Sequence, residues 1–229
     1  STNDVSTANA LLDLATTHPG ATRSAHLVEL AGQIGRSNLT SRLAALTRNS
    51  DSPLLLPALR ALGLTADPSA AASLAEHVSS VSLPVRSAAL AALLPLRSLI
   101  AVPALVQAAS DPSLKPQAIE GLLQTPDLRA LDLYLEALES RSAATRTSAR
   151  QALHRIHVEA LPRILQRLPK LPPPAIAELQ SVYRTNRTPD TAALFAIEAP
   201  RPTREAFLEH ALANRGDIAK GKTLFEDRT

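Results

Sequence analysis

The chain has 229 residues and a formal net charge of +3, and 45% of it is hydrophobic but only 2% aromatic, with no Cys, Met or Trp. Ala and Leu favour helices, whereas strands favour aromatic and β-branched residues, so the composition predicts an all-helical fold with a core of Ala, Leu, Val and Ile. The missing cysteine excludes disulfides, thiolate nucleophiles, zinc–cysteine clusters and covalent haem attachment within these residues, and the small net charge does not indicate a polyanionic partner.

No apolar run reaches the roughly 18 to 20 residues that span a bilayer, and the acidic start lacks the basic and apolar regions of a signal peptide. We therefore expect a soluble segment that makes no contact with a membrane. The chain opens with Ser1 and Thr2 rather than Met, so we expect a piece of a longer protein, with any export signal upstream.

A motif of two small residues, three positions apart and followed by Leu, recurs along the chain. Its copies begin at intervals of 31, 29 and 31 residues. The twelve members form the predicted repeat core: Ala58, Ala61, Leu62, Ala89, Ala92, Leu93, Ala118, Gly121, Leu122, Ala149, Ala152 and Leu153. A further copy, 31 residues before the first, places Leu27, Leu30 and Ala31 at the same positions. A fixed period of this kind indicates a repeat architecture.

A second apolar stripe lies between successive copies of the motif. It recurs with the same period and predicts a second helix through Leu74, Leu105, Leu135 and Ile164, with Ala71, Val102, Leu131 and Leu161 on the same face. Proline-containing breaks separate the stripes at Asp67-Pro68, Asp111-Pro112 and Pro126-Asp127. Each unit is therefore predicted to form helix, turn, helix, turn.

A pair of short helices cannot bury its apolar face alone, so neighbouring pairs must stack. Small residues let the helix backbones approach closely, and the following Leu fills the space between layers, so the core needs no aromatic rings. The regular period favours an open array over a globular bundle. The sequence thus predicts an all-α fold of the α-α superhelix class, a curved solenoid of stacked antiparallel helix pairs.

The unit around Ala89 resembles a HEAT repeat of the bacterial type through Pro84-Val85-Arg86-Ser87-Ala88-Ala89-Leu90-Ala91-Ala92-Leu93, then Ala101-Val102-Pro103-Ala104-Leu105-Val106 and Asp111-Pro112. The unit around Ala149 is similar. The resemblance covers about residues 20–185 and implies a HEAT-like helical repeat domain over residues 1–200. The pattern decays beyond Tyr183, so we expect caps or boundaries at the ends.

Basic residues recur at one position of the repeat. Members of the family often carry a basic residue three positions before the first small residue, and Arg86, Lys115 and Arg146 stand there, with Arg150 one turn after Arg146. In the unit at Ala58 the position holds Leu55. One interpretation is an inter-unit ladder, in which guanidinium groups bond loop carbonyls or acids of the adjoining unit. The other is a basic ridge that faces an anionic partner, and we favour the ladder.

The sequence does not indicate catalytic, cofactor-binding or metal-binding residues. His154 and His157 with nearby Glu159 could offer metal ligands on one helical face, but no further fixed ligand is evident, so we expect ordinary exposed histidines. Carboxylate pairs such as Glu136 and Glu139 suit a solvated helix face, and no Gly-rich phosphate loop is present. We therefore predict a segment that is not an enzyme.

The chain after residue 200 differs from the repeats. Prolines at 200 and 202 predict a linker, and Phe207, Leu208, Ala211 and Leu212 predict one face of an amphipathic helix. The following Arg215-Gly216-Asp217-Ile218-Ala219-Lys220-Gly221-Lys222-Thr223-Leu224-Phe225-Glu226-Asp227 resembles the first helix of a class I c-type cytochrome domain. The resemblance implies that residues 201–229 are a linker and the start of such a domain. Haem c is expected only downstream of Thr229, because the cysteines that attach it are absent from the chain.

Three functions are compatible with these features. The first is a non-enzymatic protein-interaction and spacer module in a larger exported redox protein, because the order of domains resembles that of large planctomycete and verrucomicrobial proteins. That resemblance implies a periplasmic or extracytoplasmic location, although a cytoplasmic one stays open. The second is a HEAT-like nucleic-acid-binding or DNA-repair protein resembling alkylpurine glycosylases, for which the chain has few of the aromatic stacking residues. The third is a bilin-lyase-like chaperone. We favour a protein partner over nucleic acid.

Overall fold

The computed structural model describes residues 2–19, 22–185 and 187–196 of the chain. All regular secondary structure in these ranges is helical, so the all-α prediction is confirmed there. Among the described helices, none combines the length and the hydrophobicity needed to cross a bilayer. The predicted linker and cytochrome-like start at residues 201–229 lie outside the described residues.

The α-helices are α1 (Thr2–Thr17), α2 (Thr22–Gly35), α3 (Thr40–Thr47), α4 (Leu55–Leu64), α5 (Ala70–His77), α6 (Leu83–Leu93), α7 (Val102–Ala108), α8 (Lys115–Gln124), α9 (Leu131–Ala137), α10 (Ala143–Arg155), α11 (His157–Arg167), α12 (Pro173–Tyr183) and α13 (Ala192–Ala196). Short 3-10 helices η1 (Arg36–Leu39), η2 (Leu94–Leu96), η3 (Leu99–Ala101), η4 (Leu128–Ala130), η5 (Leu168–Lys170) and η6 (Pro189–Thr191) extend or precede them. Prolines in the first turn open α6, α7, α8 and α12, where the missing N–H costs no hydrogen bond.

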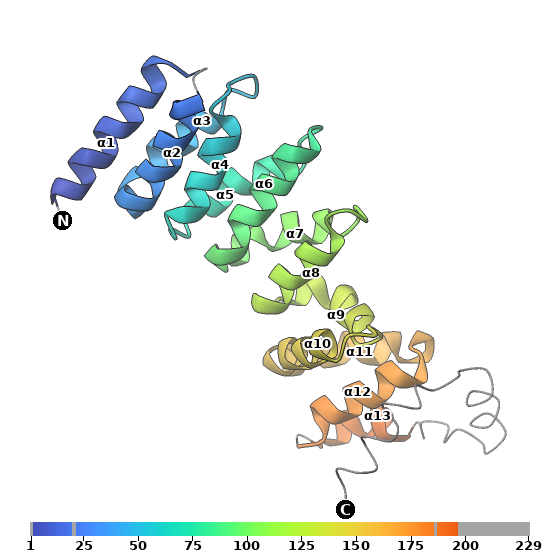
Figure 1. Ribbon diagram of the computed structural model, residues 1–229. Helices are drawn as coiled ribbons and strands as arrows, with labels where there is room; N and C mark the ends of the chain where they lie inside the picture. Colours follow the sequence, from blue (N-terminus) through green and yellow to red (C-terminus); the bar gives the residue numbers. More distant parts are fainter. Residues whose placement is uncertain (1, 20–21, 186, 197–229) are drawn as a thin grey trace, which may run out of the picture.

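The helices follow one another along an elongated molecule, with α1 at one end and α12 and α13 at the other (Figure 1). The even-numbered helices from α2 to α12 form a first-helix row, in which each packs against the next. The odd-numbered helices from α3 to α13 form a second-helix row, and each packs on a helix of the first row. We call a first helix and the second helix that follows it a unit. The substantial contacts among the described residues join elements of one unit or of adjacent units.

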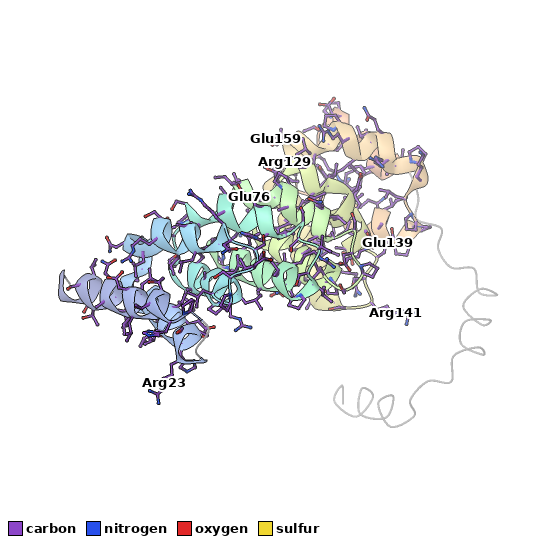
Figure 2. The ribbon with its side chains drawn as sticks, turned by 90° about the horizontal axis from the view of Figure 1, so that it is seen from above. Arg23, Glu76, Arg129, Glu139, Arg141 and Glu159 are labelled. Carbon is purple, nitrogen blue, oxygen red and sulfur yellow. The ribbon has the colours of Figure 1, made fainter. Side chains whose placement is uncertain are left out.

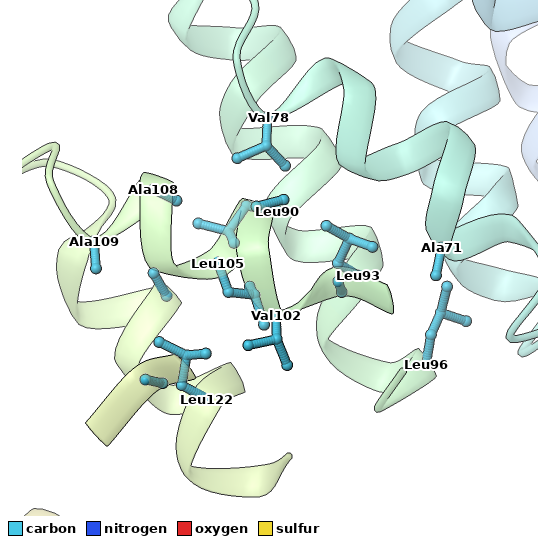
Figure 3. Close-up of a cluster of buried hydrophobic side chains, with 14 of the residues drawn as sticks. Ala71, Val78, Leu90, Leu93, Leu96, Val102, Leu105, Ala108, Ala109 and Leu122 are labelled. Carbon is cyan, nitrogen blue, oxygen red and sulfur yellow. The ribbon is translucent and has the colours of Figure 1, made fainter. Parts of the chain in front are cut away.

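The predicted repeat core lies inside the array. All twelve of its members, from Ala58 in α4 to Leu153 in α10, are buried. Figure 3 shows how Leu90 and Leu93 of α6, Val102 and Leu105 of α7 and Leu122 of α8 meet in one cluster. First and second helices of adjacent units therefore share a continuous apolar interior.

The earliest predicted copy of the motif is wrong at Leu30, whereas Ala31 of the same copy is fully buried. Leu30 is 43% exposed, although its predicted equivalent Ala61 is fully buried. The buried face of α2 instead carries Val28, Ala31 and Gly32. At Gly32, α2 packs closely on α4, because a Cβ there would lie 2.8 Å from the carbonyl oxygen of Ala61, whereas Leu30 stays largely in solvent.

The prediction of a core without aromatic rings is also wrong. Tyr134 and Tyr183 are the largest fully buried side chains among the described residues. The Tyr134 hydroxyl donates a hydrogen bond to the carbonyl oxygen of Leu122 and accepts one from the N–H of Asp127. The Tyr183 hydroxyl donates to the carbonyl oxygen of His157 in the preceding unit. A ring is thus tolerated in the stack where its hydroxyl reaches a backbone partner.

Two glycines set the closest approaches between first helices. A Cβ atom on Gly32 would lie 2.8 Å from the carbonyl oxygen of Ala61, and one on Gly63 would lie 2.9 Å from the Cα of Ala92. Each glycine stands 29 residues before a repeat-core alanine. The contacts α2 to α4 and α4 to α6 are therefore close backbone contacts that have no space for a side chain.

A left-handed residue recurs where first helices end. Arg36, Ala66 and Arg97 have φ angles of 47°, 53° and 46°, and their spacing follows the repeat period. They lie after α2, α4 and η2, between the first and second helices of a unit. This conformation commonly ends helices, because it turns the chain away from the helix axis. The turn between the two helices of each of these units thus contains a non-glycine residue in the left-handed conformation, which strains the backbone.

Candidate functional site

Arg86 in α6 joins two loops. One terminal nitrogen, Nη1, donates to the carbonyl oxygens of Ser80 and Val81 at 2.9 and 3.0 Å, in the loop before its own helix. The other, Nη2, lies 3.1 Å from Asp111 Oδ2, in the loop that leads to the next unit. The guanidinium fork therefore spans from one inter-unit loop to the next, and all of its bonds are made within the chain.

Arg146 in α10 repeats this arrangement two units later. Its Nη1 donates to the carbonyl oxygens of Ser140 and Arg141 at 2.7 and 3.2 Å, and its Nε lies 3.3 Å from Glu178 Oε1 on α12. Arg150 shares the same acid, with Nη1 3.3 Å from Glu178 Oε2. Both arginines therefore connect α10 to the next unit through a half-buried carboxylate.

Lys115, the remaining basic candidate, forms its ion pair within one unit. Its Nζ contacts Glu136 Oε1, which connects α8 to α9. A lysine at this position reaches one acid rather than two loops, because its ammonium lacks the planar fork of arginine. The four predicted basic residues thus all bind acids or carbonyls of the chain itself.

Further side-chain contacts join residues about one repeat period apart. Arg60 Nη1 lies 3.2 Å from Glu29 Oε1, Arg129 Nη2 donates to the carbonyl oxygen of Leu99 at 3.1 Å, and Arg167 Nη2 lies 2.9 Å from Asp132 Oδ2. The separations are 31, 30 and 35 residues. Most of these groups are half exposed, so each pair alone stabilises the stack little.

Aspartates at the loop positions are held in their charged form. Asp67 accepts hydrogen bonds from the Thr40 hydroxyl and from Ser69, and these bonds hold the pKa of its carboxyl below the usual range. Asp111 accepts from the hydroxyl and N–H of Ser113 and from Arg86, which lowers its pKa in the same way. The repeated Asp-Pro-Ser sequence is therefore a turn whose carboxylate also binds an adjacent unit.

The sequence predicted loop carbonyls and acids as a class of partner for these arginines, but not the particular loops. The loops Ser80-Val81-Ser82 and Ser140-Arg141-Ser142 stand at the same distance before Arg86 and Arg146. The recurrence of this Ser-x-Ser loop, with an arginine six residues after its first serine, was the available signal. Glu178 had no such signal, because no equivalent acid recurs in the other units.

The histidine pair does not form a metal site. The rings of His154 and His157 are stacked, with centroids 5.3 Å apart and planes at 10°. His157 Nδ1 lies 2.6 Å from the carbonyl oxygen of His154. Parallel rings cannot direct their nitrogens at one ion, and the described residues contain no group of three or more His, Cys, Asp or Glu that could hold a metal.

Grooves lie between successive helices of the first row. The groove between α4 and α6 has a volume of about 640 Å³ and is lined mainly by Leu, Ala and Pro, with the Arg60–Glu29 pair at its margin. The groove between α8 and α10 has a volume of about 700 Å³, and the one between α10 and α12 about 600 Å³. These two share Gln151 and Arg155 and carry more polar and charged side chains. Three grooves therefore follow the first-helix row, and a further cavity of about 590 Å³ lies beside α11, with Val158, Leu161 and Leu165 in its lining.

Neither the protein-family models nor the curated proteins that we compared with the chain gave a match.

Proposed function

We propose that the chain is a HEAT-like right-handed solenoid that serves as a non-enzymatic protein-interaction and spacer module. One observation supports this proposal above the others: side-chain bonds join residues one repeat period apart, as in Arg60 with Glu29 and Arg129 with Leu99. Bonds of this kind fix each unit against its neighbour and allow units to be added along a line. A linear stack with grooves on one row suits the spacing and docking of other proteins.

The alternative of a nucleic-acid-binding or base-repair protein has less support. Its basic ridge would consist of Arg86, Arg146 and Arg150, and these groups already bind Asp111, Glu178 and loop carbonyls. Binding of phosphate would require their release from these partners. The two tyrosines are buried and cannot stack on bases, whereas enzymes that flip a base usually stack it against aromatic side chains.

The deletion of one unit tests the spacer proposal. Removal of residues 89–117 places Ala118 at the position of Ala89 and keeps the repeat register, whereas removal of residues 89–102 takes out half a unit and breaks it. We expect the first variant to keep the helical content per residue of the parent and to unfold cooperatively in urea. The second should lose helical content and cooperative unfolding. Equal damage by the two deletions would contradict a stack of interchangeable units.

The place of the module in a larger exported redox protein rests on sequence resemblance alone. We propose that it precedes a c-type cytochrome domain, as the sequence of residues 215–227 suggests, and that it lies in the periplasm. The gene sequence beyond Thr229 tests this directly. A Cys-x-x-Cys-His motif shortly after Thr229 is the expected result, and its absence would overturn the link to a haem protein without affecting the spacer proposal.

A further inference from the structure

The grooves on either side of α10 form one continuous surface. The first takes its lining from Arg97 and from α8 and α10, the second from α10 and α12, and Gln151 and Arg155 line both. The combined surface, which we call the α10 groove, therefore crosses three successive first helices. A segment that lies in it would contact the units of α8, α10 and α12, and also Arg97 of the unit before them.

Two arginines of the α10 groove have no partner in the described part of the chain. Arg97 and Arg155 are both exposed, and neither guanidinium takes part in a side-chain hydrogen bond or ion pair there. Arg150, in the same groove, is bound to Glu178. These two unpaired guanidinium groups contrast with those of Arg86, Arg146 and Arg150, which form ion pairs with carboxylates of the chain.

The rest of the lining is mixed in character. Half-buried Ile119 and Leu123 supply an apolar floor on α8, while Gln124, Ser148 and Gln151 offer amide and hydroxyl groups. A lining that mixes apolar and hydrogen-bonding groups matches a polypeptide, which offers backbone hydrogen-bonding groups and apolar side chains. The groove between α4 and α6 lacks this mixture, because small and aliphatic side chains dominate it.

Two features disfavour a nucleic acid in the α10 groove. Glu120 lies in its lining and would repel a row of phosphates. The lining contains no Phe, Tyr or Trp on which bases could stack. A peptide avoids both costs, because its acidic residues can be spaced to meet Arg97 and Arg155 while neutral residues face Glu120.

We propose that the α10 groove binds a polypeptide segment that carries acidic and apolar residues, with its carboxylates paired to Arg97 and Arg155. This inference rests on the proposed function as an interaction module and adds the chemistry of the partner. It assigns the apolar residues of the segment to Ile119 and Leu123, and the carboxylates to the two free guanidinium groups.

Selection of peptides from a random library on the immobilised full chain tests the proposal. We expect the selected peptides to be enriched in Asp and Glu together with Leu, Ile or Val. Charge reversal at both arginines, Arg97→Glu with Arg155→Glu, should weaken the binding of a selected peptide by at least about tenfold, because attraction becomes repulsion at two points. Ala144→Trp, which fills the groove and leaves the charge unchanged, should weaken it as well.

Arg163→Glu provides the matched control, since Arg163 is an exposed arginine of α11 in the other row. It should leave peptide affinity unchanged, and all variants should retain the melting temperature of the parent. Peptides that bind equally well to the groove variants would overturn the inference and leave the interaction module standing. If the chain binds duplex DNA but no peptide, and the Arg97 and Arg155 variant loses DNA binding, both the inference and the interaction module would be overturned. Binding of no probe would overturn the inference alone, because the unit deletions test the spacer separately.

Discussion

Arg86 Nη2 lies 3.1 Å from Asp111 Oδ2, so one side chain joins the loop before α6 to the loop after α7. Arg146 holds the equivalent loop two units later and reaches Glu178 in place of an aspartate. Arg86 and Arg146 thus make the same loop contacts but pair with different acids. This indicates that the repeat requires a contact between units and not one particular ion pair.

The first prediction concerns the ladder arginines. Arg86→Ala should lower the free energy of unfolding by about 1 kcal/mol through its two lost loop hydrogen bonds. Arg86→Lys should recover only part of this, because an ammonium cannot reproduce the guanidinium fork. Urea denaturation measures both changes. Arg163→Ala is the control and should stay within about 0.5 kcal/mol of the parent. An equal effect at Arg163 would contradict a stabilising role for the Arg86 hydrogen bonds.

The close glycine contacts give the second prediction. Gly63→Ala should destabilise the fold by about 1 to 3 kcal/mol, because the new Cβ would lie 2.9 Å from the Cα of Ala92. Helix propensity alone favours Ala over Gly by about 1 kcal/mol, so the two effects have opposite signs. Thermal and urea unfolding decide between them, and a more stable variant would show that α4 and α6 do not approach so closely.

The left-handed turns give the third prediction. Ala66 has a φ of 53°, so Ala66→Gly should stabilise the protein by about 1 kcal/mol through relief of strain. The same change at Ala177, an exposed position inside α12, should destabilise it by about the same amount. The two midpoints of urea denaturation should move in opposite directions, and a shared direction would contradict the assigned backbone at Ala66.

The fourth prediction concerns the packing of the repeat core. Ala89→Arg and Ala149→Arg each place a long charged side chain at a fully buried position between first helices. An unpaired buried charge costs about 3 to 5 kcal/mol, which is a large part of the stability of most domains. We expect loss of the cooperative melting transition. An unchanged melting temperature in either variant would contradict the packing.

The fifth prediction concerns alkaline pH. Burial raises the pKa of Tyr134 and of Tyr183 to about 12, whereas tyrosine in the unfolded chain titrates near 10. Both hydroxyls are therefore neutral below pH 10, and the stability that burial of the neutral form provides is lost as the pH rises from 10 towards 12. Because the chain contains only these two tyrosines and no tryptophan, its phenolate absorbance reports on them alone.

Native protein should consequently develop no phenolate absorbance near pH 10, and urea-unfolded protein should. Tyr134→Phe and Tyr183→Phe assign the signal to each ring. A native titration step at the ordinary pKa of tyrosine would mean that at least one hydroxyl is open to solvent.

The repeat period and the helix pairs were predictable because apolar residues recur at fixed spacing and burial follows them. The exposure of Leu30 was not predictable, since Leu30 matches the motif while the close contact of α2 with α4 is made at Gly32. The partners of Arg86 and Arg146 were predicted only as a class, although a Ser-x-Ser loop begins six residues before each arginine and marks its carbonyl partners. The α10 groove could not be found in the sequence at all. Its lining joins Arg97 to α12, and only the stacking of four units brings these residues onto one surface.

Distances between spin labels test the linear stack most directly, and the chain has no native cysteine to interfere with labelling. One cysteine replaces Arg23, whose side chain projects from the surface in Figure 2, and the second replaces in turn the exposed residues Ala91, Glu120, Gln151 and Ala177. Packed helices lie about 8 to 10 Å apart, so the distance from Arg23 should rise by roughly this amount with each unit. A distance from Arg23 that is shorter to Ala177 than to Glu120 would contradict an open stack.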